Sequence, residues 1–469
     1  MDDLSRPRQR HHPSVAAKYR WVTLITLCMA VLVAQVDTAV VNLALHPIGE
    51  YFSASVNALQ WIVDSYNLVY AVLLLTGGQL ADLYGRRRIF MVGAAIITVA
   101  SFLCAFAPSL TILISGRALA GLGAALLIPA SLAIIRVVWH EPMERGRALG
   151  IWAACNGLAL AIGPTLGGFL ISRFDWQSIF LATIPLSLTA LLLAIPSITE
   201  SSDLRDRHFD APAQLLGATA LGSLAFSAIQ LHSMPRLAII TFAVALFAIV
   251  LFIKLEAKKG AVALVPLDIF RVREFRGAII ATTGMTFGMY GTLFLLPLTW
   301  QSSGRLDATG AGIALMPMAL VFVLVSPFSG VLAKKFSVSF MTAGGVAIIG
   351  SGLLLIGLSA HLASIVLTEI GLTLTGFGMG LATGPLMGAV VGAVTPDRSG
   401  TASALINAAR MAGATIGVAV LGALFAMMHD SQDGLRLSMF LGGLVQIICA
   451  TVAWATMRPK AGVVQRAAL

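Results

Sequence analysis

The stretch VLVAQVDTAVVNLAL, from Val31 to Leu45, lies inside an apolar run that extends over about residues 20–45. A run of about 18 or more apolar residues is long enough to cross the hydrocarbon core of a bilayer, about 30 Å, as an α-helix. Asp37 interrupts this run near its middle. A charge at the centre of a spanning helix costs about 2.5–3.5 kcal/mol, so such residues usually face the protein interior and have a function. The stretch therefore predicts a membrane helix with a functional carboxyl group.

Composition extends this conclusion to the whole chain. Of its 469 residues 58% are hydrophobic and 11% are charged, and the mean hydropathy is +0.90. An average soluble domain has about 25% charged residues. The alternating pattern of a membrane β-barrel is absent from the sequence, and helices satisfy their own backbone groups in lipid. We therefore expect an all-α membrane protein.

Fourteen segments are apolar and long enough to be membrane spans. They cover roughly residues 20–45, 56–77, 89–107, 110–136, 147–171, 177–197, 213–231, 237–256, 276–299, 309–332, 338–359, 363–392, 401–428 and 437–457. With the N-terminus in the cytoplasm, 25 of the 31 Lys and Arg residues fall in cytoplasmic segments and four in outer loops. This asymmetry is typical of inner-membrane proteins with both termini inside.

The remaining composition excludes several classes of protein. The net charge of +10 comes from short loops between spans, which argues against a nucleic-acid partner. The four cysteines lie in apolar spans without the spacing of a metal site or a disulfide framework. The glycine-rich GLGAAL, Gly121 to Leu126, lies within a span and lacks the lysine of a phosphate-binding loop. We expect no enzyme activity, no cofactor, no metal, and a monomer.

Two pairs of similar loops indicate an internal duplication. GGQLADLYGRR (Gly77–Arg87) resembles GVLAKKFS (Gly330–Ser337), with Gly78 aligned to Gly330 at an offset of 252 residues. PMERGRAL (Pro142–Leu149) resembles PDRSGTAS (Pro396–Ser403), with Pro142 aligned to Pro396 at an offset of 254 residues. Such repeats are typical of transporters whose binding site lies between two halves near the midplane. The predicted divisions are a cytoplasmic N-terminal tail (1–19), a six-helix bundle (20–197), cytoplasmic loops with two additional helices (198–275), a second six-helix bundle (276–457) and a cytoplasmic tail (458–469).

The motifs resemble those of the major facilitator superfamily. GQLADLYGRRR matches its loop signature G-x-L-A-D-x-x-G-R-[RK], and RALAGLGAALLIPAS (Arg117–Ser131) resembles its fourth-helix pattern. AIGPTLGGFL (Ala161–Leu170) is similar to the antiporter signature G-x-x-x-G-P-x-x-G-G of the fifth helix, with Ala159 in place of the first glycine. VDTAVVNLAL resembles the first helix of the fourteen-helix drug:proton antiporters. The resemblance implies the major facilitator fold, two six-helix bundles plus two extra helices.

The loop after the second span is expected to act as a conformational latch formed by Gly78, Asp82, Gly85, Arg86 and Arg87. The two glycines permit close helix approach and a sharp turn. Asp82 is poised for the N-terminus of a nearby helix, where unpaired N–H groups favour an anion. We expect that helix end at residues 400–402. The alternative is a solvated loop that only sets topology, and the mixed-charge loop 198–212 is also expected to be solvated.

The fifth span carries Gly163, Pro164, Gly167 and Gly168. Small residues let helices pack closely, and a proline kinks a helix. We expect a pliable seam between the bundles, although ordinary packing glycines would give the same pattern. The family resemblance associates this signature with antiport.

Ionisable and polar residues within the spans are the candidates for function. A carboxyl group shielded from water holds its proton more tightly and can release it when wetted. The proton-coupling candidates are Asp37, Asp64, Arg117 and Glu369. The substrate-binding candidates are Asp37, Asn42, Trp61, Asp64, Tyr66, Asn67, Tyr70, Asn156, Glu369 and Asn407. Structural alternatives are a wet position near the membrane surface for Asp64, an interfacial aromatic belt for Trp61, and an anchor for Arg410.

The sequence thus predicts a proton-coupled antiporter that exports small amphipathic compounds, cationic ones first, by alternating access. Carboxylates and aromatic faces both attract cations. Two alternatives stay open: a proton-coupled importer or lipid or metabolite transporter of the same fold, and a membrane sensor without transport.

Overall fold

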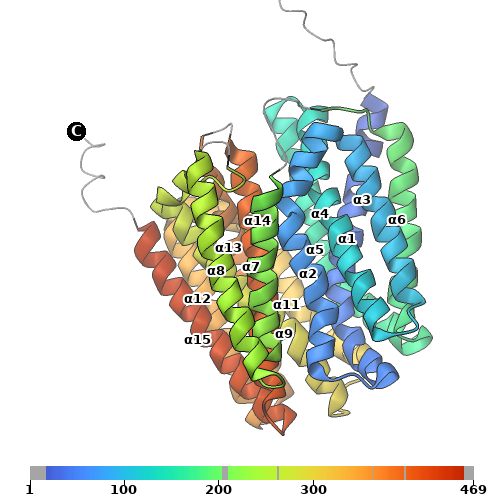
Figure 1. Ribbon diagram of the computed structural model, residues 1–469, viewed down its shortest axis with the longest axis vertical. Helices are drawn as coiled ribbons and strands as arrows, with labels where there is room; N and C mark the ends of the chain where they lie inside the picture. The colour runs from blue at the N-terminus through green and yellow to red at the C-terminus, as the bar shows by residue number, and fades with distance from the viewer. Residues whose placement is uncertain (1–16, 203–209, 261–262, 363, 396–397, 459–469) are drawn as a thin grey trace, which may run out of the picture.

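The computed structural model describes residues 17–202, 210–260, 263–362, 364–395 and 398–458. The described part is helical, and its helices stand side by side as a bundle (Figure 1). The helices are α1 (Ala17–Phe52), α2 (Val56–Tyr84), α3 (Arg86–Ala105), α4 (Leu110–Val138), α5 (Pro142–Phe174), α6 (Gln177–Ser197), α7 (Ala211–Gln230), α8 (Pro235–Lys259), the short 3-10 helix η2 (Leu267–Arg271), α9 (Arg273–Ser302), α10 (Ala308–Ala314), α11 (Met316–Phe336), α12 (Val338–Leu362), α13 (Ile365–Gly392), α14 (Ser399–Ala426) and α15 (Ser431–Met457).

Among the described residues, fourteen helical segments are long and apolar enough to cross a membrane. The fourteen predicted spans are therefore confirmed, with ends that shift by several residues. α10 and α11 make up one of them, Ala308–Ala333, and meet at Leu315. Leu315 keeps helical angles, and Pro317 lies in the first turn of α11, where a missing N–H costs no hydrogen bond. The division of this span into α10 and α11 therefore coincides with Pro317, which has no N–H to continue the hydrogen-bonding of α10.

Short polar residues at the loops begin several helices. Ser55, Ser109, Asp210, Asp307 and Ser364 each accept a hydrogen bond from a backbone N–H in the first turn of the following helix. Such N-caps satisfy one of the four unpaired N–H groups at a helix start. The loops between spans are therefore short and sharply bounded.

The helices pack as two bundles with the same internal arrangement. In the first bundle α1 packs against α5 and α6, and α4 packs against α2 and α3. In the second bundle α9 packs against α14 and α15, and α13 packs against α11 and α12. Each helix of the second set is the repeat partner of one in the first. In Figure 1 the helices of the first bundle run from blue to green, and those of the second bundle run from yellow to red.

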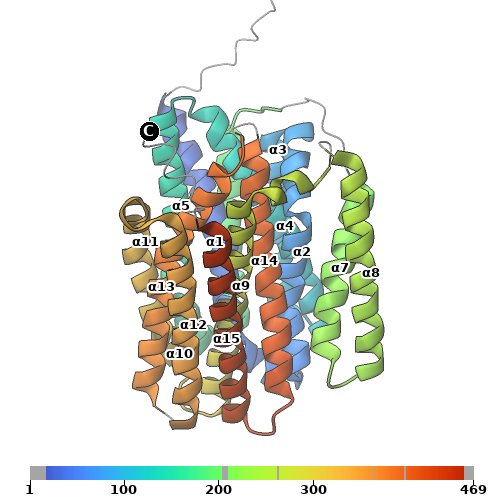
Figure 2. The same cartoon turned by 90° about the vertical axis from the view of Figure 1, so that its left-hand side faces the viewer.

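The additional helices α7 and α8 form a pair at one edge of the molecule (Figure 2). α7 packs against α2 of the first bundle and α14 of the second. Gln214 of α7 donates a hydrogen bond to the Val72 carbonyl oxygen of α2 and accepts one from Thr76. α8 has few buried residues and faces outward. The pair therefore lies over the seam between α2 and α14.

The polar contacts that cross the bundle interface are concentrated at one end of the helices. The face that holds the start of α1 and the end of α15 is called the terminal face here. Polar contacts across the interface gather near the face opposite to it, at Gln60, Gln301 and Thr309. On the terminal-face halves of α5 and α11, Met143 and Val331 are 73% and 69% exposed. The interface is therefore tight at the opposite face.

Candidate functional site

A buried ion pair joins two helices of the first bundle. Arg117 Nη1 of α4 lies 2.5 Å from Asp37 Oδ2 of α1, and the two side chains are 1% and 7% exposed. Asp37 lies near the middle of α1, and Arg117 lies about two turns into α4. Removing one partner from such a pair leaves an uncompensated charge and costs about 3–5 kcal/mol. The two predicted proton-coupling residues are thus direct partners.

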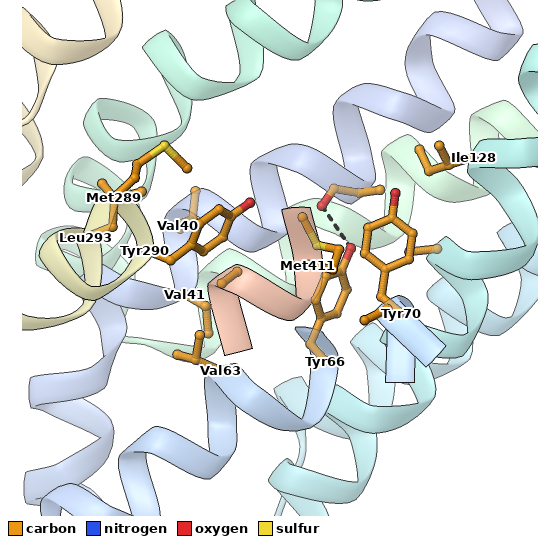
Figure 3. Close-up of a cluster of buried hydrophobic side chains, with 14 of the residues drawn as sticks. Val40, Val41, Val63, Tyr66, Tyr70, Ile128, Met289, Tyr290, Leu293 and Met411 are labelled. Carbon is orange, nitrogen blue, oxygen red and sulfur yellow. Dashed lines mark hydrogen bonds between the residues drawn. The ribbon is translucent and has the colours of Figure 1, made fainter. Parts of the chain in front are cut away.

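Tyr66 completes the surroundings of Arg117. The guanidinium carbon lies 4.8 Å from the centre of the Tyr66 ring, and Nε donates a 3.2 Å hydrogen bond to the Ile62 carbonyl oxygen. The Tyr66 hydroxyl donates to the Ala34 carbonyl oxygen at 3.2 Å, the dashed line in Figure 3. Arg117 is therefore held by α1 and by α2 at once.

A cluster of aromatic and methionine side chains lies beside this pair, between the bundles (Figure 3). Tyr66 and Tyr70 of α2 lie with ring centres 6.0 Å apart. Met411 of α14 lies beside Tyr66, and Tyr290 of α9 lies beside Val40 and Val41 of α1, so both face this region from the second bundle. We call these four residues the inter-bundle cluster. Methionine and tyrosine offer an adaptable, polarisable surface that suits varied apolar and cationic partners.

Arg410 of α14 adds a positive charge near the inter-bundle cluster. It directly precedes Met411 in the chain, and its Nε is buried without a hydrogen-bond partner in the described part of the chain. Asn407, one turn earlier, is partly buried and donates to the Ser403 carbonyl oxygen at 2.9 Å.

Asp64 and Asn67 form a second polar position on α2. Both are fully buried, at 0% exposed. Within the described residues neither oxygen of Asp64 and neither polar atom of Asn67 has a hydrogen-bond partner. Buried polar groups are normally hydrogen-bonded, so such pairs of orphans point to a functional role. The interpretation of Asp64 as a wet surface position is wrong, because the residue is fully buried in the structure.

The other predicted residues lie apart from the ion pair. Trp61 packs with Phe226 of α7, ring centres 6.0 Å apart, and so does not join Tyr66 and Tyr70. Glu369 lies in the second turn of α13 and is partly exposed. Asn42 is 2% exposed and donates within α1 to the Thr38 carbonyl oxygen at 3.2 Å. The side chain of Asn156 lies outside the described residues.

The loop between α2 and α3 is held by a residue that the sequence did not suggest. Asp82 accepts hydrogen bonds from Arg86 at 2.8 and 3.1 Å. The carboxylate of Glu200, just after α6, accepts from the backbone N–H groups of Arg87 and Arg88 at 3.1 and 3.2 Å. Glu200 thus occupies the N-terminus of α3, where an anion is stabilised. Glu200 is exposed, as expected for a solvated loop, but its carboxylate is held in place by these hydrogen bonds.

The glycines of this loop have separate roles. Gly85 has a φ of 107°, and a Cβ there would lie 2.6 Å from the Glu200 carboxylate. Gly78 has only an ordinary contact of 3.6 Å with Pro129. The close helix approach belongs instead to Gly77, whose added Cβ would overlap the backbone of Ala125 in α4. The prediction of close approach at Gly78 is therefore off by one residue.

The latch partner proposed for Asp82 was the start of α14. The surroundings of Ser399 and Gly400 lie outside the described part of the chain, so this contact stays a prediction.

The glycines of α5 face two different neighbours. Gly163 and Gly167 pack on Ala39 and Val40 of α1, within the first bundle. Gly168 packs on the backbone of Ala308 in α10, in the second bundle. The seam between the bundles thus passes along this stretch of α5.

Two cluster residues, Tyr290 and Met411, did not emerge from the sequence. A signal existed for Tyr290, since it is one of six tyrosines and lies in the middle of an apolar span. Met411 had no such signal, because methionine is common in apolar helices and only the packing reveals its position.

Comparison with known proteins decides the family. A sequence model described as Major Facilitator Superfamily matches residues 27–418, most of the chain. The chain belongs to the major facilitator superfamily. The family has the two-bundle fold that the repeat predicted.

Named relatives in this superfamily are similar over most of their length. Multidrug resistance protein Stp of Mycobacterium tuberculosis (strain CDC 1551 / Oshkosh) is 34% identical, over 86% of this chain and 76% of that protein. Multidrug efflux pump LfrA of Mycolicibacterium smegmatis is 31% identical, over 88% and 82%. Methylenomycin A resistance protein of Bacillus subtilis is 30% identical, over 92% and 93%.

Proposed function

We propose that this protein is a proton-coupled exporter of small amphipathic compounds, with lipophilic cations as its first class of cargo. It acts by alternating access in the cell (inner) membrane, as a monomer with both termini in the cytoplasm. The single observation that carries this proposal is the buried pair of Asp37 and Arg117, 2.5 Å apart. The names of the relatives, which describe efflux and resistance, agree with it.

The ion pair supplies a way to couple a proton to a change of shape. Asp37 attracts Arg117 only while it is ionised, so a proton on Asp37 removes the attraction that joins α1 to α4. α1 and α4 both belong to the first bundle, and α1 also packs against α9 of the second. Loss of the attraction can therefore change how α1 packs against α9 at the bundle interface.

Asp64 is the second carboxyl group of the proposal. It lies on α2, which packs against α14 across the bundle interface. A cationic cargo in the inter-bundle cluster competes with protons for the same negative charges. Cargo that arrives from the cytoplasm then displaces protons inward, and protons from outside later displace cargo outward.

The inter-bundle cluster is the proposed cargo surface. Tyr66, Tyr70 and Tyr290 present ring faces, which attract organic cations by roughly 0.5–2 kcal/mol each. Met411 can adapt its shape to different cargo. This combination favours a broad range of flat, apolar cations over one specific metabolite.

The tight contact at the face opposite the termini supports a cytoplasm-open form of the transporter. In such a form the exposed halves of α5 and α11 border the cytoplasmic entrance. Cargo would enter there or from the inner leaflet.

Transport in proteoliposomes tests the proposal. Tetraphenylphosphonium and ethidium serve as lipophilic cation probes, in vesicles whose protein orientation is measured by protease access to the termini. With acid on the face opposite the termini, an exporter accumulates the probe on that acidic side. Accumulation on the alkaline side would indicate a symporter, and a sensor would move neither probe nor proton. Asp37→Asn should abolish the gradient-driven flux, whereas Glu144→Gln, which breaks the exposed pair with Arg20, should preserve it.

A further inference from the structure

Two buried glutamines cross the interface between the bundles in opposite directions. Gln60 of α2 is 0% exposed, and its Nε2 donates to the carbonyl oxygens of Val418 and Ala419 in α14, at 2.9 and 3.0 Å. Gln301 of α9 is 8% exposed, and its Nε2 donates to the Leu43 carbonyl oxygen of α1 at 3.0 Å. Each bundle thus contributes one glutamine side chain that donates a hydrogen bond to the backbone of the other bundle.

A third polar contact lies at the same level of the molecule. The hydroxyl of Thr309 in α10 donates to the Gly168 carbonyl oxygen of α5 at 3.1 Å and lies 2.8 Å from Ser172 Oγ. Gln60 lies in the second turn of α2, Gln301 next to the end of α9, and Thr309 in the first turn of α10. All three positions adjoin loops on the face opposite the termini.

The site around Gln60 is shaped for its side chain. A Cβ on Gly422 of α14 would overlap the Gln60 carboxamide, with Cδ at 2.8 Å. The absence of a side chain at position 422 therefore lets the carboxamide reach the α14 backbone. The arrangement depends on the specific pairing of one glutamine with one glycine.

We propose that Gln60 and Gln301 are positioning residues that form an outer latch, which closes the bundles at the face opposite the termini. The inference rests on the proposed alternating access, because it requires that this interface open in another state. Asp64 lies one helical turn from Gln60 on the same face of α2, so the closed latch covers Asp64 from that side.

The chemistry suits a contact that breaks in each cycle. A carboxamide carries no charge, so the latch itself neither binds nor releases a proton. A neutral hydrogen bond contributes little enough that its loss shifts an equilibrium by roughly two- to tenfold. Protonation of the carboxyl groups can therefore control a latch whose own strength is independent of pH.

The chain contains a matched control in Gln446 of α15. This residue is also 0% exposed, and its Nε2 donates to the Met285 carbonyl oxygen of α9 at 3.1 Å. Both helices belong to the second bundle, so this contact does not cross the interface. Replacement of Gln446 tests the loss of a buried carboxamide without the loss of a latch.

Distance measurement by double electron–electron resonance tests the proposal. In a background with the four cysteines replaced, spin labels are placed with Asn57→Cys at the start of α2 and Met428→Cys after α14. The expected result is a greater population at long distance, by roughly two- to tenfold, for Gln60→Leu and for Gln301→Leu. Gly422→Ala should act in the same direction, because it displaces the Gln60 carboxamide. Gln446→Leu should lower the melting temperature and leave the distances unchanged.

Three outcomes would overturn the latch. They are unchanged distances in Gln60→Leu and Gln301→Leu, an equal shift in Gln446→Leu, and no long-distance population in any variant. Size-exclusion chromatography verifies that each variant is folded, and Gly422→Ala retains the glutamine if Gln60→Leu fails to fold. The distances need no transport, so they can be repeated in Asp37→Asn. If the latch variants still shift the distances when flux is lost, the latch stands even where the proposed function fails. If flux is retained and the distances do not shift, the latch fails and the proposed function stands.

Discussion

Arg117 and Asp37, 80 residues apart in the sequence, form an ion pair in which neither side chain is more than 7% exposed. The guanidinium also donates to the Ile62 backbone and lies over the Tyr66 ring. Three helices thus meet at one arginine, which makes the pair a structural element as well as a candidate for proton coupling.

The first prediction separates these two roles. Asp37→Asn alone should destabilise the protein by about 3–5 kcal/mol, because Arg117 keeps its charge without a partner. The double variant Asp37→Asn with Arg117→Gln should recover most of this stability and still lack gradient-driven flux. Thermal unfolding and proteoliposome flux measure the two effects. Recovery of flux in the double variant would contradict proton coupling at Asp37.

The second prediction concerns the cargo surface. Tyr290→Leu should weaken binding of tetraphenylphosphonium by roughly two- to thirtyfold, since a ring face contributes about 0.5–2 kcal/mol. Tyr290→Phe retains the ring and should bind almost as the original protein does. Equilibrium dialysis with radiolabelled probe gives both affinities. Equal losses in the two variants would show that the hydroxyl, and not the ring, makes the contact.

The third prediction concerns the start of α3. Gly85→Ala should destabilise the protein, because alanine is strained at a φ of 107° and its Cβ would meet the Glu200 carboxylate. Glu200→Gln should cost about 0.3–1 kcal/mol through weaker interaction with the helix N-terminus. Unfolding monitored by intrinsic fluorescence provides the comparison. A neutral Gly85→Ala would rule out the contact with Glu200.

The fourth prediction gives a pH dependence outside the spans. Arg398 Nη1 lies 2.5 Å from Asp268 Oδ2 in η2, and this hydrogen bond lowers the pKa of Asp268. A lowered carboxyl pKa adds stability that is complete above the unfolded value, about 3.9, and disappears as pH falls through the folded pKa. Asp268→Asn should therefore lower the melting temperature equally at pH 6 and pH 8, by a small amount because the pair is partly exposed.

The control for this effect is Asp307→Asn, because asparagine retains the ability to cap α10 and Asp307 has no arginine partner among the described contacts. A difference between Asp268→Asn and the original protein that grows below about pH 4 would contradict the sign of the shift.

Several parts of the site could be read from the sequence and others could not. Asp37 and Arg117 each stand out as charges in apolar spans, so each was found alone. Their contact depends on how α1 and α4 are rotated toward one another, and one residue of shift turns a side chain by about 100° around a helix. The same limit explains why close helix approach was expected at Gly78 and is found at Gly77. The sequence motif located the loop, and only the packing shows which glycine contacts α4.

Trp61 and Glu200 are two further residues whose neighbours could not be predicted from the sequence. Trp61 follows the spacing of Tyr66 and Tyr70 closely enough to suggest one aromatic group, yet α7 occupies its side of α2. Glu200 lies in a stretch whose mixed charges are typical of solvated loops, and only the nearby start of α3 gives it a partner.

The sequence by itself determined that this chain crosses the membrane fourteen times and belongs to a duplicated fold, because apolar length and repeated motifs are properties of the chain read along one dimension. The tertiary structure alone decided which buried groups meet: Asp37 with Arg117, Gln60 with the backbone of α14, and Met411 with Tyr66. In lipid every spanning helix is apolar on most of its surface, so hydrophobicity does not specify which face turns inward. Close packing and the need to pair each buried polar group make that choice.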